Sequence, residues 1–399
     1  MQKNRLCLKR GEEHRLNSGH LWIYSNEIDT GKTPLKAFQP GEQVLVETHT
    51  GKTIGTAYVN PRALICARLI SYEDTRLDSA LLSQRLLQAN SLRTRLFKEP
   101  YYRLVYGESD LLPGLVVDRF GPHFSVQINS AGMEAVQEKI IDTLISLFKP
   151  ESILLRNDSS IRDMEGLKRE VTVAFGNSPD EVQLIENGVP MLAPLHNGQK
   201  TGWFYDQRPN RATLKKYVKG KRVLDVFSYV GSFAIQAAAF GAKEVWAVDS
   251  SRFALEIAEK NAALNGVENI FTGALGDAFD VLKTLQAEEE QFDVIIVDPP
   301  AFIKRKKDHK QGFQAYRRIN ELAMRLLADN GILLSASCSM HLKRDELMDV
   351  VRSGGQRTNN HIQVLEEGSQ GPDHPVHPAI PESRYLKAFV CRICKKAIK

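Results

Sequence analysis

The sequence has little of what marks a membrane, secreted or disulfide-stapled protein. Its 399 residues contain no apolar run of the roughly 18 residues that a membrane span requires. Residues 1–7 lack the apolar core of a signal peptide. The five cysteines are scattered along a long chain, which is typical of a reducing compartment rather than a disulfide framework. These absences predict a cytoplasmic protein with no membrane partner.

The chain also lacks a strong charge of either sign, low-complexity tracts and internal repeats. Its 53 basic and 48 acidic residues are compatible with a nucleic-acid partner but do not require one. Charged residues make up 25% and hydrophobic residues 42%, as in ordinary globular proteins. The length predicts two or three domains with a sizeable core.

Three patterns follow one another along the chain. Residues 1–75 have short apolar runs between Gly and Pro turns, which predicts a β-rich domain. Residues 76–188 begin with leucines at helical spacing over 79–97 and continue with two strand-like runs around Leu112-Pro113-Gly114, a helix over 133–148 and a strand over 152–156. Residues 189–399 alternate apolar strands with amphipathic helices, which predicts parallel βαβ units. We therefore expect an α/β protein whose C-terminal domain is Rossmann-like, preceded by a central α+β domain.

The third part should form a seven-stranded sheet. Its predicted strands are 223–227, 244–248, 269–272, 292–297, 332–337, 362–365 and 386–393. The predicted helices are 232–240, 252–264, 278–285, 315–327 and 343–351, with stops at Gly241, Asn265-Gly266 and Asn330-Gly331.

The first of these strands leads into a glycine-containing turn and a helix, an arrangement that opens a nucleotide pocket in doubly wound sheets. Such a turn can also be purely structural. Asp249 ends the next strand, where a carboxylate can bind ribose hydroxyls. The turn carries Phe227, Ser228 and Tyr229 where a pyrophosphate would need repeated glycines. This favours a cofactor without phosphate, S-adenosylmethionine.

Asp277 follows the third strand and could bind an adenine amine, cap the next helix, or do both. Residues 198–208 precede the first strand and are rich in aromatic, amide and charged groups. They form either an ordinary surface loop or a flap in which Phe204 stacks and Arg208 or Arg211 binds a cofactor carboxylate. The predicted cofactor-binding residues are Thr201, Phe204, Gln207, Arg208, Arg211, Asp225, Phe227, Ser228, Tyr229, Gly231, Asp249, Ser250, Asp277, Ala278 and Asp298.

Cys338 and Asp298 each follow an apolar strand and are the predicted catalytic residues. A cysteine there could be a buried structural residue, but the carboxyl end of a strand in such a sheet faces the ligand crevice. A thiolate could add to C6 of cytosine and so activate C5, while Asp298 binds the edge of the base. Pro299 and Pro300 would stiffen the backbone against the substrate, although Asp-Pro-Pro could merely end a strand.

Basic and aromatic residues supply the predicted RNA contacts. Lys304 begins the run Lys304-Arg305-Lys306-Lys307 just after Pro300, and Lys9, Arg10 and Trp22 lie in the first domain. A charge run is otherwise a solvated face. Cys391 and Cys394 form an isolated CxxC without the second pair that a zinc site needs, so we expect packing residues and no metal.

Several long motifs occur in one order over nearly the whole chain. They are Gly107-Glu108-Ser109-Asp110 with residues 112–119, Lys200-Thr201-Gly202 to Asp206-Gln207-Arg208, Phe227-Ser228-Tyr229, Asp298-Pro299-Pro300, Ser337-Cys338-Ser339 and Asp373-His374-Pro375. Together they resemble the PUA-domain S-adenosylmethionine-dependent RNA methyltransferases, closest to the bacterial enzymes that methylate cytosine C5 in 23S rRNA. The resemblance implies an N-terminal PUA domain, a central connecting domain and a C-terminal methyltransferase domain, with Cys338 as catalytic cysteine.

The sequence departs from related enzymes that carry a second cysteine beside the Pro-Pro motif, because Ala301 and Phe302 stand there. The base that removes the C5 proton is therefore open, and Asp298 acting through water is our hypothesis. Two other functions also remain open: N-methylation of a purine in rRNA, and a non-catalytic RNA-binding role in ribosome assembly. A homodimer is one possible assembly state.

Overall fold

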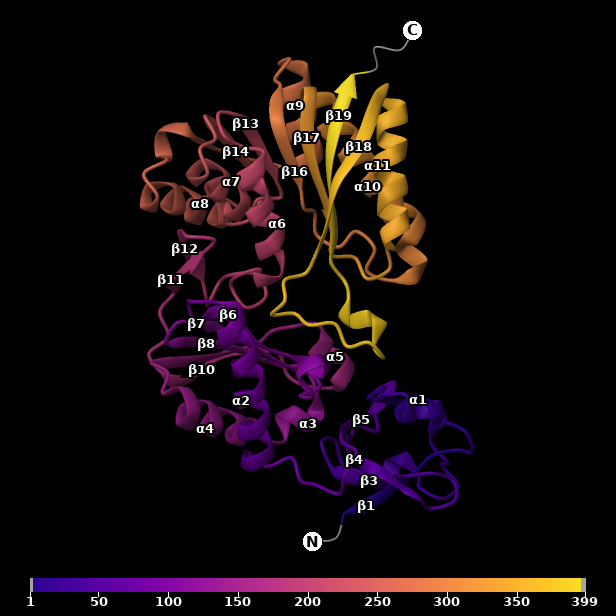
Figure 1. Ribbon diagram of the computed structural model, residues 1–399. Helices are drawn as coiled ribbons and strands as arrows, with labels where there is room; N and C mark the ends of the chain where they lie inside the picture. The colour runs from indigo at the N-terminus through magenta and orange to yellow at the C-terminus, as the bar shows by residue number, and fades with distance from the viewer. Residues whose placement is uncertain (1–2, 396–399) are drawn as a thin grey trace. The chain divides into compact units, whose positions relative to one another are not determined.

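The computed structural model describes residues 3–395, which divide into two compact units. The N-terminal unit comprises residues up to 182 together with 194–203 and 372–383, and the C-terminal unit comprises 183–193, 204–371 and the chain from 384 onward. Figure 1 shows the elements of both units. Within residues 3–395, no helix combines the length and apolar character needed to cross a membrane.

The chain begins with a five-stranded sheet in the order β1-β3-β4-β5-β2. Its strands are β1 (Asn4–Cys7), β2 (Trp22–Tyr24), β3 (Gln43–Glu47), β4 (Thr53–Val59) and β5 (Ile65–Ser71). Aliphatic side chains from all five strands form its core, and the one α-helix among residues 3–75 is the single turn α1 (His14–Asn17). The predicted β-rich domain is confirmed.

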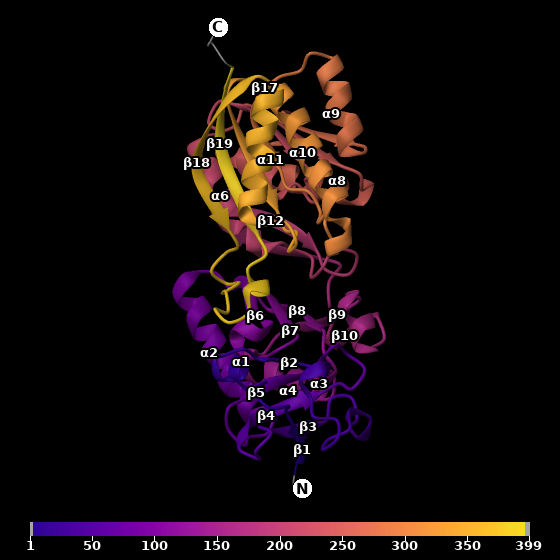
Figure 2. The same cartoon turned by 90° about the vertical axis from the view of Figure 1, so that its right-hand side faces the viewer.

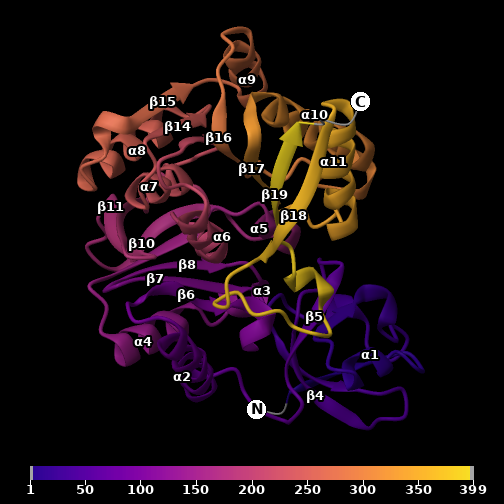
Figure 3. The ribbon, with the colours of Figure 1, turned by 45° about the horizontal axis from the view of Figure 1, so that its top comes forward.

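A second sheet, in the order β10-β9-β8-β7-β6, follows in the same unit. Its strands are β6 (Tyr101–Tyr106), β7 (Leu115–Phe120), β8 (His123–Ile128), β9 (Ser152–Asn157) and β10 (Glu170–Gly176). Helices α2 (Ser79–Leu96) and α4 (Gln137–Phe148) bury their leucines and isoleucines against it, and Figure 3 shows both on one side of these strands. The Asp78 carboxylate caps α2 by accepting from Ala80 N and Leu81 N, 3.1 Å each.

The central region differs from prediction in four respects. Three strands, not two, surround Leu112-Pro113-Gly114, because Gly121 adopts a positive φ of 63° and folds β7 back into β8. The helix predicted over 133–148 is two helices, α3 (Ala131–Glu134) and α4, and a short helix α5 (Ile161–Glu165) and strand β10 were not predicted. Asn187-Gly188, where the predicted central domain ends, is the turn of the hairpin β11 (Glu181–Glu186) and β12 (Val189–Pro194), with φ of 55° and 83°.

A late segment of the chain, residues 372–383 between β18 and β19, belongs to the N-terminal unit. Asp373 is fully buried there: its carboxylate accepts from Arg103 N at 3.0 Å and its carbonyl accepts from Arg93 Nη2 at 2.9 Å. Ile380 joins the core of the first sheet. The N-terminal unit is therefore completed by residues near the end of the sequence.

The C-terminal unit holds the predicted seven-stranded sheet, in the order β15-β14-β13-β16-β17-β19-β18. Its strands are β13 (Arg222–Val226), β14 (Glu244–Asp249), β15 (Phe271–Leu275), β16 (Phe292–Val297), β17 (Leu327–Ser337), β18 (Asn360–Ser369) and β19 (Lys387–Lys395). Its helices are α6 (Arg208–Thr213), α7 (Ser232–Ala239), α8 (Arg252–Leu264), α9 (Ala278–Ala287), α10 (His309–Leu326) and α11 (Arg344–Arg357). The first five strands are mutually parallel, and β19 runs antiparallel to both of its neighbours.

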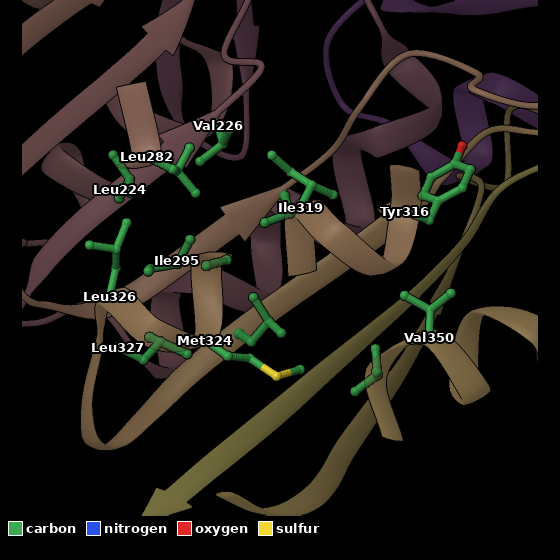
Figure 4. Close-up of a cluster of buried hydrophobic side chains, with 14 of the residues drawn as sticks. Leu224, Val226, Leu282, Ile295, Tyr316, Ile319, Met324, Leu326, Leu327 and Val350 are labelled. Atoms are coloured by element: carbon green, nitrogen blue, oxygen red, sulfur yellow. The ribbon is translucent and has the colours of Figure 1, made fainter. Parts of the chain in front are cut away.

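Alternate residues of the inner strands pack into two separate cores, as expected for a sheet covered on both faces. In β16, Ile295 and Val297 join the core formed with α9, α10 and α11, whereas Val294 and Ile296 join the core formed with α7 and α8. Figure 4 shows the first of these cores, with Tyr316 at one end of it. In Figure 2, α10 and α11 lie beside each other next to β17 and β19.

The predicted bounds fail mainly around Asn330-Gly331. The helix predicted over 315–327 is α10, which begins six residues earlier, and β17 already begins at Leu327. Asn330 has a positive φ of 63° inside that strand, and the pairing with β16 shifts register at its start. The Asn-Gly pair is thus an irregularity of a strand rather than a helix stop. Helix α11 also extends six residues beyond its predicted end, and β18 is longer than predicted.

Candidate active site

The candidate site lies at the edge of the seven-stranded sheet where the parallel strands end. Strand β13 is flanked by β14 on one side and β16 on the other, so the strand order reverses at β13. Doubly wound sheets bind ligands at the carboxyl ends of strands beside such a reversal. The segments that follow β13, β16 and β17 start from adjacent strands, as predicted.

Residues 227–231, which we name the β13 loop, have a strained backbone. Phe227 and Tyr229 adopt positive φ values of 67° and 51°, and Gly231 has a φ of 76°. Such conformations cost about 1–3 kcal/mol each for residues other than glycine and persist where the surroundings impose them. Here Asp249 Oδ2 accepts from Tyr229 N at 2.9 Å, and Val248 O accepts from Phe227 N at 2.9 Å.

Two polar atoms next to this loop are buried without a hydrogen-bond partner among residues 3–395. They are Asp225 Oδ1 and Ser228 Oγ. The other Asp225 oxygen accepts from Ala234 N at 3.1 Å and so caps α7. Burial is the main cause that raises the pKa of Asp225 to about 8, assisted by the negative charges of Asp298 and Asp249. Unsatisfied buried polar atoms are rare, and they fit a loop built to meet a polar cofactor.

Asp249 and Asp277, the predicted ribose and adenine contacts, already accept hydrogen bonds from backbone N–H groups. Asp249 accepts from Ser251 N at 2.8 Å in addition to Tyr229 N, and each carboxylate oxygen retains a second lone pair. Asp277 caps α9 by accepting from Phe279 N at 2.9 Å, and it is exposed. The capping role of Asp277 is confirmed, and its binding of an adenine amine stays a prediction. Ser250 is exposed and Ala278 is buried next to these two acids.

Residues 204–211 pack beside the β13 loop through an aromatic contact. The ring of Phe204 meets that of Tyr229 edge to face, with centroids 5.5 Å apart. Both Arg208 and Arg211, however, bind the buried carboxylate of Glu186, with Arg208 Nε 3.3 Å from Oε2. Their observed role is thus to hold Glu186, which the sequence did not single out.

The two remaining residues of the predicted flap are also engaged. Gln207 is buried and accepts from Asn210 Nδ2 at 2.6 Å. Thr201 belongs to the N-terminal unit, where its hydroxyl donates to Asp118, which also binds Arg103 Nε at 2.8 Å. Cofactor contacts by residues 201–211 remain predictions.

Cys338 and the Asp-Pro-Pro motif lie together. Cys338 is half-buried immediately after β17, and its Sγ is 3.9 Å from Pro299 O. Asp298 is half-buried after β16, and its backbone N–H donates to Val226 O at 3.4 Å. Pro299 is buried and Pro300 is exposed. The thiol is therefore next to the predicted substrate motif rather than sealed among aliphatic side chains.

Hydroxyl groups on both sides of Cys338 tie the end of β17 to α10. The Ser337 hydroxyl donates to the Tyr316 oxygen at 2.9 Å, and the hydroxyl oxygens of Tyr316 and Ser339 are 2.8 Å apart. Ser339 Oγ also accepts from Ile303 N, 3.2 Å away, in the segment after Pro300. Burial raises the pKa of Tyr316 to about 12. No sequence pattern pointed to Tyr316, since its partners are distant along the chain.

Lys387 is a third residue, after Glu186 and Tyr316, that the sequence did not point to. It is buried at the start of β19, opposite Ser337 in the strand pairing. Its ammonium group donates to the carbonyl of Ser339 and, at 3.0 Å, to that of Tyr385. Burial lowers the pKa of Lys387 to about 8, and the charges of Cys338 and Glu346 oppose that shift. A lone lysine in the apolar run 386–391 is the signal that could have found it.

The predicted RNA-binding residues fall into two groups. Lys304 and the three basic residues after it are exposed in the C-terminal unit, and Arg305 pairs with Asp308 at 2.9 Å. In the N-terminal unit Arg10 is exposed, Lys9 Nζ donates to Asn26 O at 2.7 Å, and Trp22 Nε1 donates to Glu108 at 2.8 Å. Cys391 of the CxxC pair packs in the core with α10 and α11, as predicted.

Comparison with known proteins identifies the family of an N-terminal and of a C-terminal part of the chain. Residues 171–391 match the family described as S-adenosylmethionine-dependent methyltransferase, and residues 6–72 match the PUA-like domain. Ribosomal RNA large subunit methyltransferase I of Klebsiella pneumoniae strain 342 is 35% identical over 98% of both chains. The enzyme of that name from Escherichia coli O139:H28 is 36% identical over 98% of this chain and 99% of its own.

Solved structures share the fold. A chain described as a SAM-dependent methyltransferase from Streptococcus mutans superposes with a TM-score of 0.82 at 20% identity, covering 98% of this chain and all of its own. A second methyltransferase structure, complexed with SAH, has a TM-score of 0.83 at 20% identity, with the same coverage. The chain is thus a SAM-dependent enzyme with an N-terminal PUA-like domain, and it belongs to the family of ribosomal RNA large subunit methyltransferase I.

Proposed function

We propose that this enzyme methylates carbon 5 of a cytosine in 23S ribosomal RNA through a transient covalent bond from Cys338. The relatives that match it over 98% of its length are named ribosomal RNA large subunit methyltransferase I. The observation that carries the covalent mechanism is the position of Cys338, a half-buried thiol after β17 with its sulfur 3.9 Å from Pro299 O.

The chemistry explains the need for a thiol. Carbon 5 of cytosine is a poor nucleophile, and addition of the Cys338 thiolate to C6 moves an electron pair onto C5. S-adenosylmethionine would supply an electrophilic methyl group on a sulfonium centre, and when C5 takes that group the S–CH3 bond would break and the sulfur would leave as a neutral thioether. Once C5 carries the methyl group, a base must take the C5 proton. The electron pair left behind restores the C5–C6 double bond, and Cys338 leaves as thiolate.

The Asp-Pro-Pro motif supports this role. Asp298 follows β16 at the same sheet edge and can hydrogen-bond the N3 and N4 edge of the base. Proline rings fix φ and force the preceding residue to be extended, so Pro299 and Pro300 hold the backbone in one shape against the substrate. We keep Asp298, acting through water, as the candidate acceptor of the C5 proton.

The cofactor would occupy the edge of the sheet around the β13 loop. The buried unpartnered oxygens of Asp225 and Ser228 and the strained backbone of the loop support this placement. Asp249 and Ser250 would meet the ribose, Asp277 and Ala278 would meet the adenine, and Phe204 would stack on the cofactor. Gln207, Arg208 and Arg211, which lie in the same unit as the loop, complete the proposed set.

RNA binding would draw on both basic groups. Phosphate contacts from Lys304, Lys9 and Arg10 and stacking on Trp22 fit a domain that binds RNA and an enzyme that must expose a base. A cytosine in a stacked region has to be flipped out before Cys338 can reach C6. A cytoplasmic location and a homodimer stay predictions.

The proposal is tested with Cys338→Ala, assayed by transfer of labelled methyl groups to undermethylated 23S rRNA and by mass spectrometry of the nucleosides. We expect transfer to fall by at least about a thousandfold, since nucleophilic addition is the step that activates C5. Cys394→Ala, in the terminal strand, is the matched control and should leave transfer unchanged. Unreduced transfer by Cys338→Ala would overturn the covalent mechanism, and a methylated purine as product would replace it with N-methylation.

A further inference from the structure

Lys387 is a buried cation that has no carboxylate within hydrogen-bond or ion-pair distance among residues 3–395. Its side chain is 7% exposed, and none of the ion pairs found within residues 3–395 includes it. Removing an ammonium group from water costs several kcal/mol unless a charge or several hydrogen bonds compensate. Lysines are therefore almost never fully buried without a partner, and those that are often serve a function.

One hydrogen bond of Lys387 reaches residues 337–339, which we name the cysteine segment. Its Nζ donates to Ser339 O, the carbonyl of the residue after Cys338, and to Tyr385 O at 3.0 Å. In the sheet, Lys387 pairs with Ser337, the residue before Cys338. The lysine thus contacts the backbone on one side of the thiol and lies opposite the backbone on its other side. Both acceptors are neutral, so neither balances its positive charge.

The other ionisable groups near Lys387 have their own partners. Glu346 of α11 pairs with His309 at 2.9 Å and accepts from Lys343 N at 2.7 Å. The Tyr316 hydroxyl from α10 is bound within the Ser337 and Ser339 network. Arg344 of α11 pairs with Glu367 of β18. The charges of Cys338 and, more weakly, of Glu346 act on Lys387 against the effect of burial on its pKa.

We propose that Lys387 is a positioning residue for the reaction: its ammonium group stabilises the thiolate of Cys338, and its hydrogen bonds hold the backbone that carries the sulfur. This inference rests on the proposed function, because it supposes that Cys338 is the nucleophile. An ordinary thiol, with a pKa of about 8.5, is only a few per cent thiolate at neutral pH. A neighbouring cation favours loss of the proton to solvent and so raises the share of reactive enzyme.

The inference is tested by the pH dependence of Cys338 alkylation. The full-length protein, without RNA, is treated with iodoacetamide between pH 5 and 10, and mass spectrometry follows the peptide that contains Cys338. In the wild type we expect half-maximal reactivity at a pH below about 8.5, the ordinary thiol value. Lys387→Met keeps the length of the side chain without its charge, and it should move this midpoint upward by about one unit or more.

Two further variants separate charge from packing. Lys387→Arg retains a cation and should restore most of the wild-type midpoint. Lys395→Met removes an exposed lysine from the same strand β19 and should leave the midpoint where it is. With saturating rRNA and cofactor, Lys387→Met should lower kcat about tenfold near pH 7 with little change in KM, because one pH unit changes the thiolate fraction about tenfold.

A wild-type midpoint at or above about 8.5 would overturn the inference without any variant, so it can be tested even if Lys387→Met fails to fold. An unchanged midpoint in a Lys387→Met protein with a normal unfolding curve would overturn it as well. Failure of the proposed function looks different. In that case Cys338→Ala would retain methyl transfer, whatever the effect of Lys387 on alkylation.

Discussion

The β13 loop and the segment around Cys338 occupy the same edge of one sheet but are held in different ways. The β13 loop is held through its backbone: positive φ values at Phe227, Tyr229 and Gly231, with N–H groups bound to Asp249 and Val248. The cysteine segment is held through side chains, with Ser337, Ser339, Tyr316 and Lys387 bonded across three elements. The first arrangement fixes the shape of a loop, and the second fixes the position of one reactive atom. Substitutions should therefore damage the two places differently.

Gly231→Ala should have the largest effect on stability and cofactor binding, because it alters the backbone conformation of the β13 loop directly. A Cβ at this position would lie 2.9 Å from the Ala258 Cβ, in addition to the cost of its positive φ. We expect a loss of about 3 kcal/mol in the free energy of unfolding and at least tenfold weaker cofactor binding. Urea unfolding and calorimetry with S-adenosylmethionine measure the two effects.

The control for this prediction is Gly220→Ala. Gly220 also has a positive φ, of 69°, but a Cβ added there would have no atom within 4 Å beyond its own chain neighbours. The variant should lose only about 1 kcal/mol of stability and bind the cofactor normally. Equal losses in both variants would show that close packing does not shape the β13 loop.

Asp225→Asn tests the buried carboxyl under the same loop. The pKa of Asp225 is raised to about 8, so between about pH 4 and pH 8 the unfolded chain releases a proton that the folded protein retains. This contribution makes the wild type less stable as pH rises through that window, by at most about 1.4 kcal/mol per pH unit. Asparagine does not titrate, so the variant should gain stability relative to the wild type from pH 4 to 8.

Urea unfolding at four pH values within this window measures the difference. Asp142→Asn, which replaces an exposed carboxylate of α4, serves as the control for the loss of a surface carboxylate. A difference for Asp225→Asn that stays constant would mean that its carboxylate is ionised in the folded protein.

Tyr316→Phe perturbs the cysteine segment instead of the β13 loop. It removes the hydroxyl that joins Ser337 and Ser339, so each of these two buried serine hydroxyls loses one hydrogen bond, at a total cost of about 2 kcal/mol. We expect kcat for rRNA methylation to fall while the affinity for S-adenosylmethionine is unchanged. Tyr72→Phe, which loses the hydrogen bond from an exposed tyrosine to Leu16 O, should cost under about 1 kcal/mol. Weakened cofactor binding in Tyr316→Phe would contradict the distinction between the two places.

Asp277→Ala should have the smallest effect on stability, about 1 kcal/mol from the lost cap of α9. Ser251→Ala removes the cap of another helix of the same unit, α8, in which Ser251 Oγ accepts from Ala254 N at 3.2 Å. This variant should cost a similar amount of stability. If Asp277 also binds the adenine amine, only its variant should bind S-adenosylmethionine more weakly, by about tenfold. Equal affinities would leave Asp277 as a cap alone.

The same contrast explains what the sequence could predict. The β13 loop, Asp249 and Asp277 lie at the ends of strands with clear apolar runs, so their place at one sheet edge follows from local pattern and from the rules for parallel sheets. Cys338 and Asp298 could be predicted for the same reason. Tyr316, Lys387 and Glu186 could not, because each matters through a partner distant in sequence. No local pattern shows which buried residue meets which.

The local sequence pattern also gave wrong element boundaries at Asn-Gly pairs, because the same pair occurs in different kinds of structure. Asn330-Gly331 and Asn187-Gly188 both resemble the end of an element, yet one lies inside β17 and the other forms the turn of the β11–β12 hairpin. A left-handed residue can end a helix, close a hairpin or interrupt a strand, and only the pairing partner decides among these.

The return of residues 372–383 to the N-terminal unit limits how the enzyme can be dissected. A fragment that starts at residue 189 would retain Asp373 and Ile380 but lose Arg103, Arg93 and the first-sheet core with which they pack. A fragment that stops at residue 188 would lack residues 372–383 altogether. Neither half can be cut out cleanly, so transplanting the catalytic portion onto another RNA-binding module would require redesigning this segment first.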